Sequence, residues 1–312
     1  MRPIERVAVV GAGLVGCSWT VVFAAGGAEV RVFDERSEAR DDVPRRVAQT
    51  LTDTHAAGLA GEPGPILARI TVCGTLDEAL EGADYVQESV FEREDVKAEV
   101  CAEIGRRIAA PTVVGSSSSG IPASRFTETA ANRDRFLIAH PVNPPHLIPV
   151  VELVPAPWTA PEIVPWLAGE MRRFGQAPVK VDREVQGFIL NRLQGALLNE
   201  AWALYEEGYA SLADIDATVS QGLGLRWAFM GPFETIDLNA PGGIADYAER
   251  LAPLYFDIAK SRTAPRGWSK ELIARAADER RSALPASSLP ERGQWRDRRL
   301  MQLVAHLRKA KG

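Results

Sequence analysis

The segment Val7-Ala-Val-Val-Gly11-Ala-Gly13-Leu14-Val15-Gly16 joins a short β-branched run to three glycines with the spacing G-x-G-x-x-G, and an apolar helix is predicted after it, from about Leu14 to Ala25. A glycine loop between a strand and a helix is the context in which this spacing binds a dinucleotide rather than forming an ordinary turn. The loop lets backbone amides approach a pyrophosphate, which the helix N-terminus also attracts. The residues predicted to hold the cofactor here are Gly11, Gly13, Leu14, Val15 and Gly16.

Asp34 follows the next predicted strand, Glu29–Phe33, and lies eighteen residues after Gly16. A carboxylate in this place accepts hydrogen bonds from the ribose of adenosine and repels a 2′-phosphate, so we expect NAD rather than NADP as the cofactor. A nearby arginine can accommodate that phosphate, and Arg36 therefore favours the opposite choice.

Strands and helices alternate along the first part of the chain. This alternation predicts an α/β Rossmann-type doubly wound sheet domain over residues 1–184. From Val185 the apolar residues repeat with a helical period and no further strand is expected, which predicts an all-α C-terminal domain over residues 185–312. The strands predicted after the first are Glu29–Phe33, Ile70–Val72, Ala83–Val86, Thr112–Val114, Phe136–Ala139, Val150–Val154 and Ala177–Val181, and the main helices between them are Val43–Ala57 and Val96–Ile108.

The composition excludes several classes of function. The chain has 312 residues, 46% of them hydrophobic, and a formal net charge of −5, which fits a globular protein that does not bind nucleic acid. Its three cysteines and four histidines form no cluster with the spacing of metal ligands, so we expect no metal. No leader-like segment precedes the first strand and no apolar run approaches membrane-spanning length, so we expect a cytoplasmic protein that makes no membrane contact.

His140 ends the apolar run Phe136–Ala139, and Asn143 follows it closely. Glu152 lies in the next apolar run, Ile148–Val154. In an α/β sheet the carboxyl ends of the strands form the ligand cleft, and His140 occupies such an end. Most single histidines are structural or exposed, but a histidine with a carboxylate within reach can act as an acid–base pair.

These motifs, in this order, resemble the 3-hydroxyacyl-CoA dehydrogenase superfamily from about Val7 to Asn239. Several segments are similar to its lambda-crystallin and L-gulonate 3-dehydrogenase branch, whose substrates are free hydroxy acids. The superfamily motifs are the Gly11 loop, Asp34, Glu88-Ser-Val-Phe-Glu92 with Lys97, Ser116-Ser-Ser-Ser119, His140-Pro-Val-Asn143-Pro, Val151-Glu152-Leu and Gly187-Phe-Ile-Leu-Asn191-Arg, and those of the branch include Glu200-Ala-Trp and Gly222-Leu-Gly-Leu-Arg226-Trp-Ala-Phe-Met-Gly231-Pro.

The resemblance implies a set of roles. His140 would be the general base and Glu152 would hold its imidazole, while Ser119 and Asn191 would bind the substrate oxygen. The chain has Ser117-Ser-Ser119-Gly120 where the acyl-CoA enzymes usually have Asn-Thr-Ser-Ser, so Ser117 or Ser118 could supply the working hydroxyl instead. A homodimer through the helical domain is also implied. The residues expected along NAD, besides the glycine loop and Asp34, are Glu92, Lys97, Ser117 and Asn143.

Two features bear on the substrate. The segment between Asp34 and Ile70 has no lysine, unlike the Lys-rich hairpin that the acyl-CoA enzymes use around coenzyme A. Arg226 lies among apolar residues, where an arginine needs an anionic partner. That partner could be a substrate carboxylate, or Glu234 or Asp237 in a structural ion pair.

We therefore expect an enzyme that uses NAD to oxidise the 3-hydroxyl of a small free hydroxy acid to the 3-keto acid. One alternative is a 3-hydroxyacyl-CoA dehydrogenase that acts on short-chain acyl-CoA thioesters. A second alternative is a non-catalytic, crystallin-like protein that only binds NAD.

Overall fold

A computed structural model describes residues 1–262 and 264–311, and the contacts among them divide the chain into two compact units. The sheet unit comprises Met1–Leu193 with Asp297–Gly312, and the helical unit comprises Gln194–Arg296. The sequence predicts a division after residue 184, whereas residues 185–193 and the C-terminal segment are grouped with the sheet unit by their contacts.

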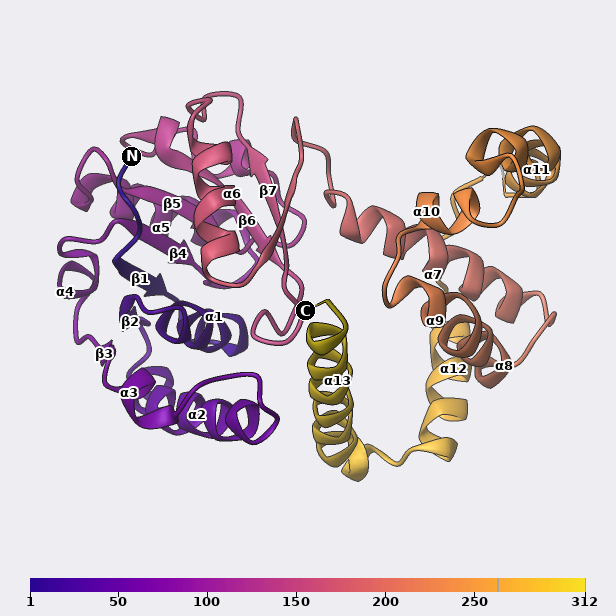
Figure 1. Ribbon diagram of the computed structural model, residues 1–312, viewed down its shortest axis with the longest axis horizontal. Coiled ribbons are helices and arrows are strands. Elements are labelled where there is room, and N and C mark those ends of the chain that lie inside the picture. The colour runs from indigo at the N-terminus through magenta and orange to yellow at the C-terminus, as the bar shows by residue number, and fades with distance from the viewer. Residues whose placement is uncertain (263, 312) are drawn as a thin grey trace. The chain divides into compact units, whose positions relative to one another are not determined.

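The sheet unit is built on eight strands in the order β3-β2-β1-β4-β5-β6-β7-β8 (Figure 1). Every neighbouring pair is parallel except β6 and β7, which are antiparallel. The carboxyl ends of β1, β4, β5 and β6 therefore meet at one edge of the sheet. The strands are β1 (Arg6–Val10), β2 (Glu29–Phe33), β3 (Ile70–Val72), β4 (Tyr85–Glu88), β5 (Val113–Ser116), β6 (Phe136–Pro141), β7 (Val150–Pro155) and β8 (Ala177–Lys180).

Helices cover both faces of this sheet, because side chains alternate between the two faces of each strand. Val7 and Val9 of β1 belong to one buried cluster with residues of α1, α2 and α6, while Ala8 and Val10 belong to a second cluster with residues of α5. The predicted doubly wound fold is thus confirmed. The helices here are α1 (Leu14–Ala25), α2 (Ser37–Ala56), α3 (Pro63–Leu67), α4 (Leu76–Leu80), α5 (Glu94–Arg107) and α6 (Ile163–Arg173).

Three helices begin at residues other than those predicted, and one of them, α5, begins at Glu94, two residues before Val96. α2 begins well before Val43, because Pro44 removes only one backbone N–H from a helix that is otherwise uninterrupted. α7 (Leu190–Glu206) begins after the predicted Val185, because Gly187 and Phe188 have φ angles of 76° and 52° that no right-handed helix contains.

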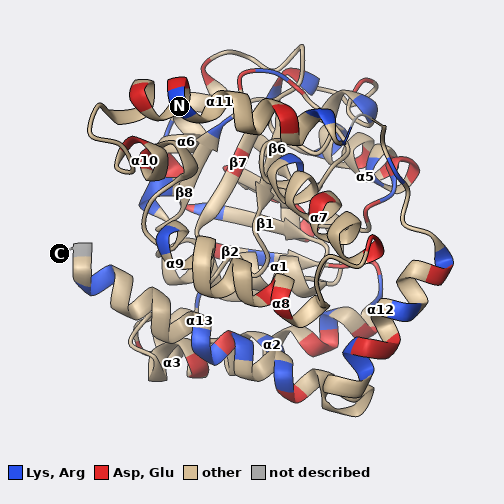
Figure 2. Cartoon of the chain, turned by 90° about the vertical axis from the view of Figure 1, so that its right-hand side faces the viewer, with Lys and Arg blue, Asp and Glu red and all other residues tan. Residues whose placement is uncertain are grey.

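The part of the chain after β8 is helical among the described residues, as predicted. Positive and negative side chains are interspersed along α2 and α12 (Figure 2). Within residues 1–262 and 264–311, no helix is long and apolar enough to cross a membrane. The remaining helices are α8 (Leu212–Ala217), α9 (Gly224–Trp227), α10 (Pro232–Asp237), α11 (Gly243–Lys260), α12 (Lys270–Ala283) and α13 (Leu289–Lys311).

The glycine loop gives a prediction for stability. A Cβ atom at Gly16 would lie 1.8 Å from the carbonyl oxygen of Gly11, whereas a Cβ atom at Gly13 would meet no atom within 4 Å. Gly16→Ala should therefore cost about 1–3 kcal/mol of unfolding free energy, the usual effect of overpacking. Gly13→Ala should stay within about 0.5 kcal/mol of the parent. Urea unfolding measures both variants, and equal losses would contradict a close approach of Gly16 to the Gly11 carbonyl.

Candidate active site

The glycine loop lies between β1 and α1 and is open where a ligand would approach. Gly13 precedes the first turn of α1 and has free space around its Cα. The Leu14 side chain is exposed, whereas Val15 packs against the core. Backbone amides at a helix N-terminus with free space before them fit the pyrophosphate of a dinucleotide.

Asp34 lies at the end of β2 and holds the loop. Its Oδ2 accepts a hydrogen bond of 2.8 Å from the Ala12 amide, and its Oδ1 accepts hydrogen bonds from the amide and Nε of Arg36, at 3.0 and 3.3 Å. The Arg36 guanidinium lies 5.1 Å from the centre of the Phe91 ring. Asp34, which favours NAD, and Arg36, which favours NADP, are therefore paired with each other.

His140 and Glu152 are opposite each other in the antiparallel ladder of β6 and β7. His140 Nδ1 lies 2.8 Å from Glu152 Oε2, and both side chains are buried. An ionised carboxylate accepts hydrogen bonds only, so Nδ1 carries the donated proton and Nε2 is left as the basic nitrogen. Nε2 has no hydrogen-bond partner in the described part of the chain.

The second oxygen of Glu152 is also fully engaged. Oε1 accepts hydrogen bonds from the amides of Ile189 and Leu190, at 2.8 and 2.9 Å, where α7 begins. Burial raises the pKa of Glu152, but the hydrogen bonds from His140 and from these two amides outweigh burial and hold the pKa below its ordinary value. Glu152 therefore keeps its negative charge beside the imidazole.

Phe188 contributes to the geometry of the site, although no role was predicted for it. It is fully buried, its φ angle is 52°, and its ring centre lies 5.6 Å from that of His140. A buried bulky residue in the left-handed region costs of order 1–3 kcal/mol and is typical of functional sites. This turn directs the two amides at Glu152. The glycine at 187, two residues into the predicted helical segment, was the available signal.

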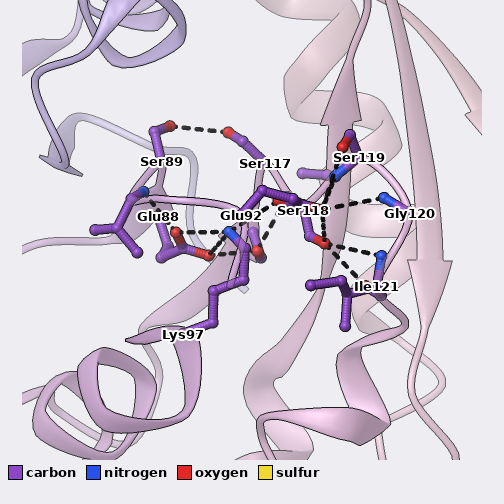
Figure 3. Close-up of polar contacts among 12 residues, drawn as sticks. Glu88, Ser89, Glu92, Lys97, Ser117, Ser118, Ser119, Gly120 and Ile121 are labelled. Atoms are coloured by element: carbon purple, nitrogen blue, oxygen red, sulfur yellow. Dashed lines mark hydrogen bonds and ion pairs between the residues drawn. The ribbon is translucent and has the colours of Figure 1, made fainter. Parts of the chain in front are cut away.

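The four serines from the last residue of β5 onward differ in accessibility, and Figure 3 shows the polar contacts of the last three. Ser116 and Ser118 are buried, and Ser117 Oγ accepts hydrogen bonds from Trp19 and Gln87 within the protein. Ser119 is exposed. Of the three alternatives left open by the sequence, Ser119 is the exposed one, and its hydroxyl donates a hydrogen bond of 3.2 Å to Glu92 Oε1.

Glu92 and Asn191 hold the loop that carries Ser119. Glu92 Oε1 accepts hydrogen bonds from the amides of Ser119 and Gly120, at 2.8 and 3.2 Å, and the Asn191 side-chain amide donates to the carbonyl of Ser119. Burial raises the pKa of Glu92, but the Lys97 charge and the Ser118, Ser119 and Gly120 donors outweigh burial and lower it. The Lys97 ammonium is buried beneath Glu92, 3.4 Å from Oε2. Asn191 thus brings the start of α7 to residues 117–120, the serine loop.

Two other predicted residues have few contacts. Asn143 is exposed in the turn after β6, where its peptide bond to Pro144 is cis. Arg226 lies in α9 of the helical unit and is exposed. The premise that it is enclosed by apolar residues was wrong, because its neighbours Leu225 and Phe229 are also exposed. Within the described residues, its guanidinium makes no ion pair, including with the predicted alternatives in α10.

His146 was not assigned a role from the sequence, yet it links two parts of the site. Its Nδ1 makes a hydrogen bond with Ser18 Oγ on α1, so the turn after β6 is tied to the helix that begins at the glycine loop. Burial lowers the pKa of His146 to about 4, against smaller opposing effects of Asp297 and Asp53. The imidazole is therefore neutral at neutral pH.

Comparisons with known proteins agree on one family. Residues 6–185 match the 3-hydroxyacyl-CoA dehydrogenase NAD binding domain, and residues 187–278 match the C-terminal domain of the same family. The chain is 37% identical over 304 residues to a lambda-crystallin homolog of Mus musculus, which covers 95% of this chain and 94% of that one. It is 40% identical over 251 residues to an L-carnitine dehydrogenase of Streptomyces griseus, covering 80% and 74%.

A solved structure is similar over nearly the whole length. It is a 5-formyl-3-hydroxy-2-methylpyridine 4-carboxylic acid 5-dehydrogenase, described as an NAD⁺-dependent dismutase. The TM-score is 0.83 at 28% identity, and the match covers 99% of each chain. The expected resemblance and the expectation of NAD are thus confirmed.

The pairing of Asp34 with Arg36 gives a prediction for cofactor choice. Asp34→Ser removes the carboxylate and frees the Arg36 guanidinium for a 2′-phosphate, so the preference for NAD over NADP should fall at least about tenfold. Adding Arg36→Ala to Asp34→Ser should abolish any gained use of NADP. Ratios of kcat/KM with the two cofactors measure the change, and an unaltered ratio in Asp34→Ser would refute the assignment.

Proposed function

This chain belongs to the 3-hydroxyacyl-CoA dehydrogenase family, and we propose that it oxidises the 3-hydroxyl of a small free hydroxy acid to the 3-keto acid. The observation that carries the proposal is the buried pair of His140 and Glu152, which keeps one imidazole nitrogen free to accept a proton. Glu92 and Lys97 are proposed along the cofactor, together with Ser117 and Asn143.

The side chains fit general-base catalysis. NAD, when bound, supplies the acceptor for the hydride. Nε2 of His140 takes the hydroxyl proton, and the imidazolium that forms is stabilised by the ionised Glu152. On substrate binding, the Ser119 hydroxyl would turn from Glu92 to the substrate oxygen, and the second amide proton of Asn191 would donate to the same oxygen and hold it within reach of Nε2.

The arginines before β3 favour a free acid over an acyl-CoA thioester. Arg45 and Arg46 on α2 are both paired with Asp42 of the same helix, and Arg69 donates to the carbonyl of Ala24. Each of these arginines therefore already has a partner within the protein, and the segment between Asp34 and Ile70 has no lysine. The structural relative that matches the whole chain has a carboxylic acid as its named substrate, and the Streptomyces relative is named for L-carnitine, which supports the same choice.

A substrate panel tests the proposal. NADH formation should be measured with L-gulonate, 3-hydroxybutyrate, L-carnitine and 3-hydroxybutyryl-CoA. A free acid should have the highest kcat/KM. A preference for the thioester would favour the acyl-CoA alternative, and no turnover of any compound would favour the non-catalytic alternative.

His140→Ala provides the internal control for that panel. Turnover of the best substrate should fall by about 10²–10⁴, the usual contribution of a positioned base. NAD binding should stay within about twofold of the parent, because His140 contacts the reacting hydroxyl. Calorimetry with NAD alone measures the second quantity. Full activity in this variant would remove His140 from the mechanism.

Arg226 is proposed to bind the substrate carboxylate, because its exposed guanidinium has no ion pair within the described residues. A charge-assisted hydrogen bond contributes about 1.5–3 kcal/mol, so Arg226→Met should raise KM for a free acid roughly tenfold or more. NAD affinity should be unchanged. Arg250→Met, which removes an arginine already paired with Asp246 in the same unit, is the matched control. Equal losses of substrate and NAD binding in Arg226→Met would indicate a structural role.

We also propose that the chain forms a homodimer through its helical unit. Large apolar side chains of α11 are exposed, among them Leu254, Tyr255, Phe256 and Ile258. A contiguous apolar surface of this kind is typical of a protein interface. Sedimentation of the purified chain measures its oligomeric state.

A further inference from the structure

A buried ion pair lies beneath the serine loop (Figure 3). Glu88 ends β4 and Lys97 lies on α5, and both residues are fully buried. Lys97 Nζ lies 3.1 and 3.2 Å from the two carboxylate oxygens of Glu88. Removing two charges from water is costly, so such a pair persists only where its geometry and its other hydrogen bonds are good.

The Glu88 carboxylate accepts four hydrogen bonds. Two come from Lys97, a third from the Val90 amide at 2.7 Å, and the fourth from the Ser116 hydroxyl. A carboxylate offers about four lone-pair sites, so no site is left that could carry a proton. Glu88 is therefore ionised in this arrangement, and Lys97 is its counter-charge.

The pair is connected to the active site through Glu92. Lys97 Nζ is also 3.4 Å from Glu92 Oε2, so one ammonium bridges two carboxylates that would otherwise repel each other. The other oxygen of Glu92 holds the amides of Ser119 and Gly120. The chain of contacts thus runs from the end of β4, through α5, to the loop that carries the candidate substrate hydroxyl.

We propose that Glu88 is a positioning residue of the active site. It holds the Lys97 ammonium where that charge fixes Glu92, and Glu92 in turn fixes the backbone of the serine loop. The inference rests on the proposed placement of Glu92 beside the cofactor. NAD binding needs no hydroxy acid, so a test of this inference by NAD affinity does not depend on which substrate the enzyme uses.

The groups that face Lys97 determine how the proposal can be tested. They are Glu88 from β4, Glu92 from the following loop, the Cys101 thiol from α5 and the Phe126 ring, whose centre is 5.9 Å from Nζ. Burial raises the pKa of Cys101 well above its ordinary value, with a further rise from Glu88 and an opposing effect of Lys97, so this thiol is neutral. Among the described residues, the two carboxylates are thus the charges that offset the burial of the ammonium.

Glu88→Gln removes one of these two charges and keeps the shape of the side chain. A buried lysine that loses its counter-charge can lose its proton several pH units below its ordinary pKa. The Kd of the variant for NAD should therefore rise at least about tenfold between pH 6 and pH 9, while that of the parent changes less than about twofold. Calorimetry with NAD at each pH measures both. A flat profile in Glu88→Gln would overturn the proposal, because a purely structural role does not make NAD binding depend on the charge of Lys97.

Two matched variants separate positioning from general destabilisation. Glu88→Asp keeps the charge and should keep the profile flat. Glu170→Gln removes another internal carboxylate, which accepts a 2.7 Å hydrogen bond from the Ile4 amide and pairs with Arg173, and it should bind NAD like the parent at both pH values. A pH-dependent Kd in Glu170→Gln equal to that in Glu88→Gln would also overturn the proposal.

If Glu88→Gln does not fold, the combined variant Glu88→Gln/Lys97→Met replaces the ion pair by neutral side chains of similar shape, which proteins often tolerate. Retention of the parent affinity for NAD in this variant would overturn the proposal. A loss of at least about tenfold with normal unfolding, equal to the loss in Lys97→Met alone, would support it, because Glu88 is proposed to act through Lys97.

Discussion

One carboxylate, that of Glu152, joins three separate parts of the candidate site. It accepts a hydrogen bond from His140 on the neighbouring strand and two more from the amides at the start of α7. Because both oxygens are engaged, the imidazole cannot turn and α7 cannot begin elsewhere without leaving a buried charge unsatisfied. Asn191, one residue into α7, can then reach the serine loop. The orientation of His140 and the placement of the proposed substrate-binding groups therefore both depend on the Glu152 carboxylate.

The sequence was most predictive where local chemistry and periodicity agree. The limits of β2 and β3 were predicted to the residue. The contact of His140 with Glu152 was also anticipated from the two successive apolar runs, although the antiparallel pairing that creates it was not.

What the sequence could not supply depends on contacts between distant elements. Glu88 lies two residues beyond the strand predicted over Ala83–Val86, and only the fold reveals that it ends β4 and that α5 places Lys97 against it. Phe188 fits a helical period, so its left-handed backbone was not apparent. Apolar neighbours suggested that Arg226 was enclosed, yet in the single chain those neighbours are themselves exposed. Periodicity indicates which face of an element is apolar but not what covers it.

The antiparallel pairing of β6 and β7 has a consequence for how this scaffold can diversify. His140 and Glu152 share one rung of the ladder, so their separation is set by strand pairing and not by the turn at 142–149 that connects them. Lengthening or shortening that turn leaves the two side chains in register, whereas a slip of one residue would send them to opposite sides of the sheet. The turn that follows the base can thus be remodelled for new ligands while the proton-transfer geometry is inherited unchanged.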